Sequence, residues 1–350
     1  MIMDNGYAHG GDIYRNRVML DFSANVNPFG APEAVKQAVR DAADSIDVYP
    51  DPYCGALREK IAKAEGVGPD EIICGNGAAE LIYQFAAAVK PKRALLPVPS
   101  FSDYEDALNA AGCEPVLVPL QREENFDLNG RILNLIKDGA DCVMLASPNN
   151  PTGRTVDPAL LLRILERSRE TGAWVFLDES FYELTDENKA FTLVGSLIEG
   201  DRVFLLRAFT KAYGMAGVRL GYGITKNREL LNALSRTSQA WNVSSIAQAA
   251  GLAALKYPDW PKRARELVLT EKPFLIRELT KLGIGVLPGD ANYLLLTGAS
   301  GLYEALLSRG ILIRSCANYR GLTNSDCRVA VRTRSENTAL IAAIREVMHA

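Results

Sequence analysis

Histidine is scarce in this sequence, and its cysteines are scattered. His9 and His349 are the only two histidines, too few for an ordinary zinc site. The six cysteines form no Cys-x-x-Cys pair and are best explained as small buried thiols in a reducing compartment: Cys54, Cys74, Cys113, Cys142, Cys316 and Cys327. We therefore expect no metal centre and a cytoplasmic location.

Long apolar runs and an excess of positive charge are also lacking. Nowhere do eighteen apolar residues follow one another, and residues 1–11 lack the apolar region of a signal peptide, so we expect neither a leader nor a membrane span. The net charge of −3 argues against nucleic acid or an anionic membrane as a partner. The glycine fingerprint of Rossmann proteins is missing as well, because Gly75 and Gly77 have no third glycine at the proper spacing.

What the chain does have is enough apolar sequence for a large core. Of its 350 residues 48% are hydrophobic, which predicts about two domains. From residue 57 to about 256, helical patterns alternate with short β-branched runs, as in a mostly parallel sheet covered by helices on both faces. Strands are expected at residues 94–98, 115–119, 142–146, 175–178, 203–206 and 220–224.

The last third of the chain predicts a different, smaller unit. Residues 258–282 have the pattern of a long amphipathic helix disturbed at Pro273, a candidate hinge. Three strand-like segments and two helical segments follow, which favours a small α+β domain completed by the N-terminal arm. We therefore predict an arm at 1–30 that belongs to the small domain, a large domain at 31–257 and a small domain at 258–350.

Lys211 follows the apolar run at 203–206, which is typical of a buried strand, and stands in a glycine-rich loop. Low-dielectric surroundings at the end of such a strand favour the neutral amine, the form that attacks a carbonyl to make a Schiff base. Thr210 precedes the lysine and Arg219 follows it, so a hydroxyl and a cation could hold a phosphate nearby. From this stretch alone, an ordinary solvated loop remains the alternative.

Three further stretches carry groups that suit one cofactor. Asp178 ends a short apolar strand and precedes Lys211 by 33 residues (211 − 178), enough for a crossover between parallel strands. A carboxylate there can keep a pyridine nitrogen protonated, as pyridoxal phosphate (PLP) requires. Asn150 follows another strand, and its amide could bond the phenolic oxygen of that ring. Residues 75–80 form a glycine turn that opens a helix, where backbone N–H groups can surround a phosphate.

In this order, the four stretches resemble those of the fold type I PLP enzymes, the aspartate aminotransferase superfamily, over nearly the whole chain. The resemblance implies an α/β fold with a mostly parallel central sheet, helices on both of its faces and a small α+β domain. It also implies PLP as the cofactor, a small-molecule substrate and a homodimer with the active site at the subunit interface.

The resemblance assigns roles residue by residue. Lys211 would form the Schiff base and shuttle the proton at the substrate Cα, Asp178 would pair with the pyridinium nitrogen, and Arg328 would bind the substrate carboxylate with its two-pronged fork. The other cofactor contacts would be Asn150 on the ring oxygen, Phe101 on the ring face, the backbone of Ala78 and Ala79 with Thr210 and Arg219 on the phosphate, and Tyr49 on the phosphate of the neighbouring subunit.

Two positions depart from the superfamily pattern. Where most members have a tyrosine on the ring oxygen, three residues after Asp178, this chain has Phe181, and Tyr182 would on a strand point to the other face. The missing hydrogen bond should raise the pKa of the Schiff base, because the phenolate is less well stabilised. Most members have Ser or Thr on the phosphate three residues before the lysine, whereas this chain has Ala208 at that position. We therefore expect weaker cofactor binding or a water in place of the missing hydroxyl.

Residues 8–11, 21–28 and 311–319 are similar to those of the threonine-phosphate decarboxylases of cobalamin biosynthesis, relatives of histidinol-phosphate aminotransferase. Phenylalanine in place of the ring-side tyrosine is also usual in that group. The resemblance implies decarboxylation of O-phospho-L-threonine to (R)-1-aminopropan-2-yl phosphate for the corrinoid nucleotide loop. Four residues would then surround the substrate: His9, Asn25 and Arg314 at its phosphate, with Arg328 nearby.

Sequence leaves the reaction itself open, because the placement of Arg314 and Arg328 decides which Cα bond breaks. An aminotransferase acting on histidinol phosphate or an aromatic amino acid is one alternative. Decarboxylation of O-phosphoserine is another, since one methyl group discriminates by only about 1–3 kcal/mol. A PLP-binding regulator is the alternative from a different class, but Lys211 and Asp178 argue against it, as does the lack of a DNA-binding appendage.

Overall fold

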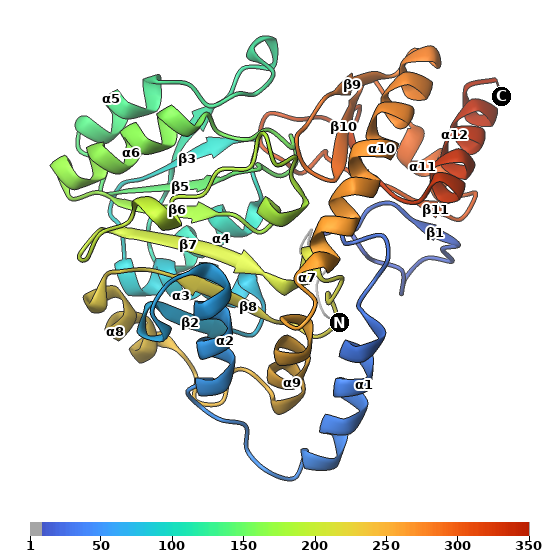
Figure 1. The fold of residues 1–350 in the computed structure, drawn as a ribbon. Coiled ribbons are helices and arrows are strands. Elements are labelled where there is room, and N and C mark those ends of the chain that lie inside the picture. The colour runs from blue at the N-terminus through green and yellow to red at the C-terminus, as the bar shows by residue number, and fades with distance from the viewer. Residues whose placement is uncertain (1–8, 350) are drawn as a thin grey trace, which may run out of the picture.

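The computed structural model describes residues 9–349. A seven-stranded sheet in the order β2-β8-β7-β6-β5-β3-β4 forms one side of the molecule, and the C-terminal elements form the other (Figure 1). All pairs from β7 to β4 are parallel, whereas β8 runs antiparallel to both of its neighbours, so the predicted mostly parallel sheet is confirmed. Its strands are β2 (Ile72–Gly75), β3 (Ala94–Val98), β4 (Val116–Pro119), β5 (Cys142–Ala146), β6 (Trp174–Asp178), β7 (Val203–Ala208) and β8 (Gly221–Ile224).

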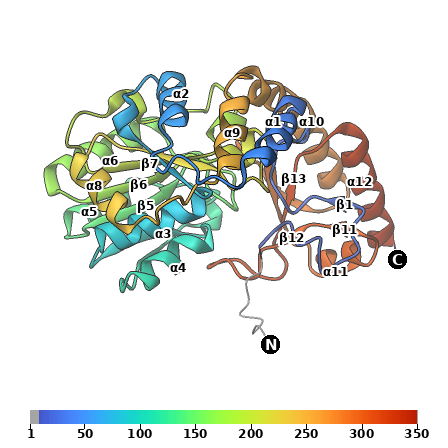
Figure 2. The ribbon, with the colours of Figure 1, turned by 90° about the horizontal axis from the view of Figure 1, so that it is seen from below.

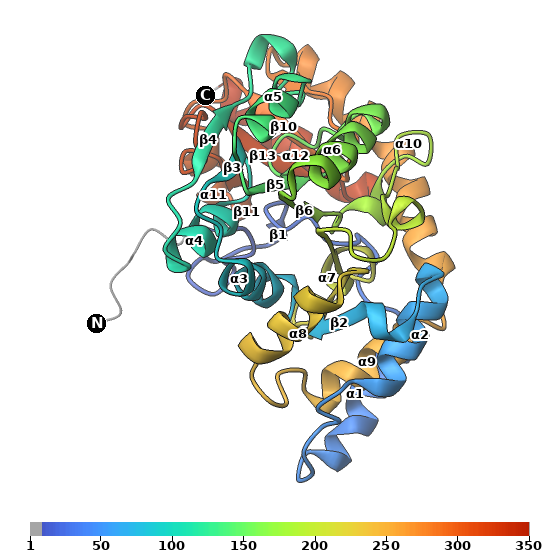
Figure 3. The ribbon, with the colours of Figure 1, turned by 90° about the vertical axis from the view of Figure 1, so that its left-hand side faces the viewer.

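Helices cover both faces of this sheet because its strands are apolar on both sides. Side chains alternate along a strand, so Val175 and Leu177 of β6 enter one core while Phe176 enters the other. The first core is closed by α2 (Gly55–Glu65), α5 (Arg131–Lys137), α6 (Pro158–Thr171) and α9 (Ser245–Ala254). The second is closed by α3 (Ala78–Val89), α4 (Ser102–Ala110) and α8 (Arg228–Thr237). Figure 3 shows α5 and α6 on one side of the strands and α3 and α4 on the other.

The C-terminal elements surround a four-stranded antiparallel sheet, β12-β13-β10-β9. Its strands are β9 (Gly285–Leu287), β10 (Tyr293–Thr297), β12 (Arg314–Ser315) and β13 (Cys327–Ala330), and its helices are α10 (Asp259–Lys281), α11 (Leu302–Leu307) and α12 (Arg334–His349). The N-terminal segment joins this unit, since β1 (Leu20–Asp21) pairs with β11 (Ile311–Leu312) beside α12 (Figure 2) and Phe22 is buried in its core. The domain boundaries at residues 30 and 257 remain our proposal.

Several local expectations differ from the structure. Helix α10 runs unbroken through Pro273, where a disturbance was expected. Pro273 is exposed to solvent, so water can replace the backbone hydrogen bond that proline removes. Strands β2 and β9 were not predicted, and the expected loop around Lys211 begins with a single helical turn, α7 (Phe209–Ala212). The remaining helix of the N-terminal part is α1 (Glu33–Ala42).

The cysteines and the helices bear on two further expectations. All six cysteines are buried free thiols, as predicted. Within residues 9–349, none of the helices combines the length and the apolar character that crossing a membrane requires.

Candidate active site

A cavity of about 520 Å³ opens at the carboxyl ends of β5, β6 and β7. Asp178 ends β6, Ala208 ends β7, and Lys211 lies in α7 directly beyond. Ligands of open α/β sheets bind at this edge because the loops that follow parallel strands meet there. Every predicted site residue except Tyr49 lines this cavity: His9, Asn25, Ala78, Ala79, Phe101, Asn150, Asp178, Thr210, Lys211, Arg219, Arg314 and Arg328.

Lys211 projects into the floor of the cavity, with its Nζ 5.4 Å from the centre of the Phe181 ring. Burial lowers the pKa of Lys211 to about 8, the Arg328 cation adds to that fall, and the Asp178 carboxylate opposes it. The backbone is fixed by the N-terminal segment, because the backbone N–H of Asn27 donates to the Lys211 carbonyl at 2.9 Å. A large fraction of neutral amine is therefore present near pH 8.

Asp178 is buried, and each of its oxygens accepts one hydrogen bond. Tyr104 Oη donates to Oδ2 at 2.7 Å, and the Ser180 N–H donates to Oδ1 at 2.7 Å. Burial raises the pKa of Asp178, while these two donors oppose the rise. Tyr104 is 74 residues away in sequence and was missed; its position three residues after Phe101, on the same face of a helix start, is the one signal that could have found it.

The N-terminus of α3 forms one wall of the cavity. Gly77 precedes the helix with φ +80°, and a Cβ at that position would lie 2.5 Å from Arg219 Nη2, so only glycine lets the guanidinium approach. Ala78 and Ala79 begin the helix, where their N–H groups have no intrahelical acceptor. The buried Thr210 lines the same cavity. Backbone donors, a hydroxyl and a cation therefore line one cavity, as an anion site requires.

Two arginines enter the cavity side by side from the C-terminal sheet. The register of β12 and β13 places Arg314 directly opposite Arg328, so both side chains project from the same face. Both are buried, with 6% and 5% of their surface exposed. Adjacent buried cations repel unless an anion lies between or beside them, so this pair is suited to a substrate that carries two anionic groups.

The arm and the Asn150 loop hold Arg328. Its Nη2 donates to the Ser23 carbonyl at 2.7 Å, and its Nη1 donates to Asn150 Oδ1. The Asn25 amide oxygen, in the orientation that satisfies both groups, accepts from Arg328 Nε at 3.1 Å. Asn25 and Asn150 therefore also orient an arginine, a contact that their predicted roles did not include.

Arg314 is held by the segment that follows it. Its Nη2 donates to Asn318 Oδ1 at 2.8 Å and its guanidinium lies 5.2 Å from the Tyr319 ring centre. Tyr319 also lines the cavity, and its hydroxyl lies 3.4 Å from Asn150 Oδ1. Asn318 and Tyr319 belong to the segment whose sequence suggested the decarboxylase group.

The residues after Asp178 correct one expectation. Tyr182 was placed on a strand, but Tyr182–Leu184 is a 3-10 helix. Tyr182 stacks on Arg207, 4.2 Å from the guanidinium carbon to the ring centre, and it is not among the residues that line the cavity. Phe181 does line it and packs edge-on against Tyr293 at 5.0 Å. The cavity therefore lacks a tyrosine hydroxyl at this position, as expected. The reason is that Tyr182 lies in a 3-10 helix outside the cavity, not that it points to the other face of a strand.

Tyr49 lies apart from this cavity. Its side chain is 76% exposed and stacks on Trp241 with ring centres 4.5 Å apart. Tyr49 is not among the residues that line the cavity of its own chain. This position is expected of a residue that serves a neighbouring subunit. Ala208, which stands where most superfamily members have Ser or Thr, also lines the cavity.

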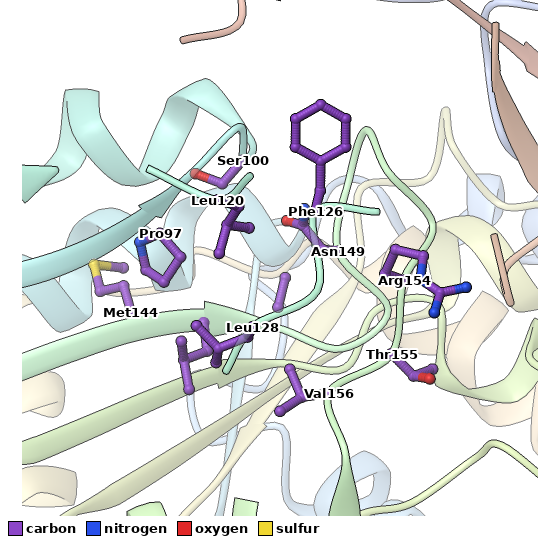
Figure 4. A pocket seen from close by; sticks show the side chains of 12 residues that line it. Pro97, Ser100, Leu120, Phe126, Leu128, Met144, Asn149, Arg154, Thr155 and Val156 are labelled. Carbon is purple, nitrogen blue, oxygen red and sulfur yellow. The ribbon is translucent and has the colours of Figure 1, made fainter. Parts of the chain in front are cut away.

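A second cavity, behind the Asn149 loop, is too small to compete. Its volume is about 20 Å³, room for a single water. Figure 4 shows its mostly apolar lining, with Leu120, Met144 and Val156 around it. Arg154 at its edge is already paired with Asp127 at 2.7 Å. We therefore assign the chemistry to the cavity that Lys211 and Asp178 line.

The cavity lined by Lys211 and Asp178 fits PLP. The buried carboxylate of Asp178 can pair with a pyridinium nitrogen, and Arg219 beside the glycine turn can bind the phosphate. The buried amine of Lys211, whose pKa is lowered, can react with the aldehyde. Together with the sheet order, these features define the class of fold type I PLP-dependent enzymes.

Comparison with known proteins agrees with this class and narrows it. The chain belongs to the family described as aminotransferase class I and II, whose profile matches residues 17–344. It is 35% identical to the threonine-phosphate decarboxylase of Salmonella typhimurium, over 97% of this chain and 96% of that one.

Two solved structures are similar in fold and in sequence. The L-threonine-O-3-phosphate decarboxylase from Porphyromonas gingivalis has a TM-score of 0.84 at 26% identity, covering 95% of this chain and 100% of its own. The histidinol-phosphate aminotransferase from Sinorhizobium meliloti, solved in complex with pyridoxal-5'-phosphate, has a TM-score of 0.84 at 25% identity, covering 95% and 92%.

Proposed function

We propose that this protein is a PLP-dependent decarboxylase that converts O-phospho-L-threonine to (R)-1-aminopropan-2-yl phosphate and CO2, a step of cobalamin biosynthesis. The similarity to threonine-phosphate decarboxylases supports the assignment. The observation that carries it is the cross-strand pair Arg314 and Arg328 in the same cavity as Lys211 and Asp178. A substrate with a phosphate and a carboxylate matches two adjacent guanidinium groups.

One set of residues in the cavity would hold the cofactor. The N–H groups of Ala78 and Ala79 with Thr210 and Arg219 would bind its phosphate, and Phe101 would lie on the ring face. Asp178 would accept from the ring nitrogen, Asn150 would donate to the ring oxygen, and Lys211 would bind the aldehyde carbon. When bound, PLP supplies the electron sink for the Cα bond that breaks.

The remaining residues would bind and orient the substrate. Arg314, His9 and Asn25 would surround the phosphate, and Arg328 the carboxylate, so their placement sets which Cα bond is aligned for cleavage. The protonated amine of Lys211, with its pKa near 8, can then donate a proton to Cα in place of the CO2 that has left.

We also propose that the active unit is a homodimer in which Tyr49 reaches the cofactor phosphate of the neighbouring subunit. Its exposure and its distance from its own cavity support this arrangement. A reducing, cytoplasmic location, suggested by the buried free thiols, is part of the same proposal.

Release of CO2 from O-phospho-L-threonine by the PLP-loaded protein, with no keto acid present, tests the proposal. The expected products are CO2 and a phosphorylated amine in equal amounts. O-phospho-L-serine, run in parallel, measures how strongly the methyl group is selected. Glutamate formed from 2-oxoglutarate and histidinol phosphate, without CO2, would instead establish the aminotransferase.

A further inference from the structure

The loop that follows β4 contacts the C-terminal part of the chain. Residues 120–128 of this loop, which we call the clasp, lie between β4 and α5. Phe126 of the clasp is buried, with 3% of its surface exposed. The other buried residues of its cluster all come from the C-terminal part: Leu287, Leu295, Cys316, Tyr319 and Leu322. The clasp therefore inserts an aromatic side chain of the large sheet's side into the core of the other side.

The backbone of the clasp is strained where it inserts. Asn125 and Phe126 both have a φ of 55°. Asparagine tolerates this left-handed conformation, but a bulky aromatic residue rarely adopts it, so surrounding contacts must hold Phe126 in place. The Phe126 N–H donates to the Gln121 carbonyl at 2.8 Å, and the ring is enclosed by its cluster. Backbone strain that the surroundings maintain is common where a function depends on a fixed position.

An ion pair fastens the same loop to the C-terminal part. Arg122 Nη1 donates to Asp326 Oδ1 at 3.1 Å, and its Nη2 donates to Oδ2 at 3.0 Å. The guanidinium carbon also lies 5.2 Å from the centre of the Phe126 ring. Asp326 accepts from the Thr323 N–H as well, and its side chain is only 1% exposed. Loss of Arg122 would therefore leave a buried carboxylate without its cation.

The segment that the clasp holds carries two residues of the cavity, Arg314 and Tyr319. The Cys316 N–H donates to the Asp326 carbonyl at 2.8 Å, and the Tyr319 N–H donates to the Cys316 carbonyl at 3.0 Å. The Arg314 guanidinium lies 5.2 Å from the centre of the Tyr319 ring, and Tyr319 also belongs to the cluster that encloses the clasp. The contacts of the clasp are thus continuous with the arginine proposed for the substrate phosphate.

We propose that the clasp determines reaction specificity, with Arg122 and Phe126 as positioning residues that fix Arg314 and so decide which Cα bond breaks. The proposal rests on the proposed function, because it needs a substrate held by its phosphate. With the phosphate fixed, the bond from Cα to the carboxylate is aligned and CO2 leaves, and Lys211 then donates a proton to Cα.

A shifted phosphate would align the Cα–H bond in place of the bond to the carboxylate. The Cα proton would then pass to Lys211 and on to the cofactor carbon, and the carboxylate would stay on the substrate. The amino group would pass to the cofactor in exchange for the aldehyde oxygen. The products would be pyridoxamine phosphate, reduced by two electrons, and a phosphorylated 2-oxo acid, oxidised by two electrons.

A purely structural role for the clasp predicts a different outcome. Loss of Arg122 would then lower Tm and leave the ratio of the two reactions unchanged. Arg131 provides the matched control, because it pairs with Glu124 at 3.4 Å and this exposed pair involves no residue of the C-terminal part. Arg131→Gln and Arg122→Gln remove the same charge from neighbouring positions. Arg122→Lys keeps the charge and removes the two-pronged geometry.

The first readout is the number of CO2 molecules released per pyridoxamine phosphate formed, measured with O-phospho-L-threonine on the PLP-loaded wild type and the three variants. In Arg122→Gln this ratio should fall about tenfold and KM should rise, because a misplaced anchor changes both the binding and the aligned bond. Arg122→Lys should lie between Arg122→Gln and the wild type, and Arg131→Gln should match the wild type. A lower Tm in Arg122→Gln, with the ratio and KM unchanged, would overturn the proposal.

The second readout needs no turnover. Cys316 is fully buried in the cluster of the clasp, so the rate at which N-ethylmaleimide labels it, followed by mass spectrometry of its peptide, reports how often the clasp opens. In the PLP-loaded Arg122→Gln protein this rate should be about tenfold higher than in Arg131→Gln, because a buried ion pair is lost. Cys142 in β5 should be labelled equally in both.

Equal labelling of Cys316 in the two variants would overturn the clasp as a device that fixes this segment. The labelling also separates this proposal from the function on which it rests. If the wild type released no CO2 from O-phospho-L-threonine, the proposed function would fail, whereas the labelling would still decide whether Arg122 holds the segment in place.

Discussion

Single residues in this site owe their chemistry to surroundings that come from distant parts of the chain. Lys211 combines burial and the Arg328 cation, which lower its pKa to about 8, against Asp178, which raises it. Arg328 arrives from β13 and Asp178 from β6. Because the pKa is lowered, the neutral amine dominates above about pH 8, whereas an ordinary lysine stays charged to about pH 10.4.

The rate at which cofactor-free protein captures PLP should therefore rise with pH around a midpoint near 8. Stopped-flow absorbance of the Schiff base measures this rate. Nα-acetyl-lysine serves as the reference amine, because the ionisations of PLP affect its reaction with PLP in the same way. Lys211→Ala should show no covalent capture and no turnover. A protein midpoint equal to that of the reference amine would contradict the lowered pKa.

Tyr104 makes a second residue-level prediction. Tyr104→Phe removes the donor to Asp178 Oδ2, a bond to a charged group worth about 1.5–3 kcal/mol. The pKa of Asp178, already raised by burial, should rise further. As the pH falls, Asp178 in the variant should therefore become protonated at a higher pH than in the wild type. The acid limb of the pH–kcat profile should move upward, with kcat about tenfold lower and covalent PLP retained. Tyr303→Phe, on α11, is the control.

At the scale of elements, periodicity predicted much of what the structure contains. The strand at 175–178 and the alternation of apolar side chains on both faces agree with β6, because a strand buried on both sides needs apolar residues at every position. The segment after it was predicted less well, since Tyr182–Leu184 closes as a 3-10 helix with no apolar repeat. Contacts that depend on register, such as Arg314 opposite Arg328, could not be predicted without strand pairing.

The two sheets meet where one loop docks on another. The Asp290 N–H donates to the Gly153 carbonyl at 2.6 Å, and Asp290 Oδ2 accepts from the Thr155 hydroxyl at 2.8 Å. Buried Lys272 donates to the Gly289 carbonyl at 2.8 Å. Gly153 lies in the loop 147–157 that also carries Asn150, so this docking couples the C-terminal sheet to the cofactor side of the site.

Gly289→Ala tests that coupling. The new Cβ would lie 2.8 Å from Gly153 Cα and 2.9 Å from the Thr152 carbonyl, both backbone atoms that cannot rotate away. Overpacking of this kind costs about 1–3 kcal/mol, so Tm should fall by several degrees and the PLP dissociation constant should rise. Gly130→Ala is the control, because its φ is −64° and nothing lies near its Cβ. Equal effects in both variants would contradict the prediction.

At the scale of the whole molecule, one exposed apolar surface stands out around Tyr49. Ile46, Val48, Tyr49 and Tyr53 are 65–76% exposed in one short segment, and Trp241, 45% exposed, stacks on Tyr49. Clustered exposed apolar side chains of this kind mark interaction surfaces. A second copy of the chain would cover this surface and bring Tyr49 to the partner's cavity in the proposed homodimer.

Mixing two inactive variants tests the shared site directly. Lys211→Ala keeps Tyr49, and Tyr49→Phe keeps Lys211, so a mixed dimer has one complete site if Tyr49 reaches across the interface. Random exchange makes half of the dimers mixed, so about a quarter of wild-type decarboxylase activity should return. PLP is held at a concentration that loads the wild type but not Tyr49→Phe. Differently tagged chains show whether mixed dimers form, and their presence without recovered activity would mean that Tyr49 does not serve the neighbouring subunit.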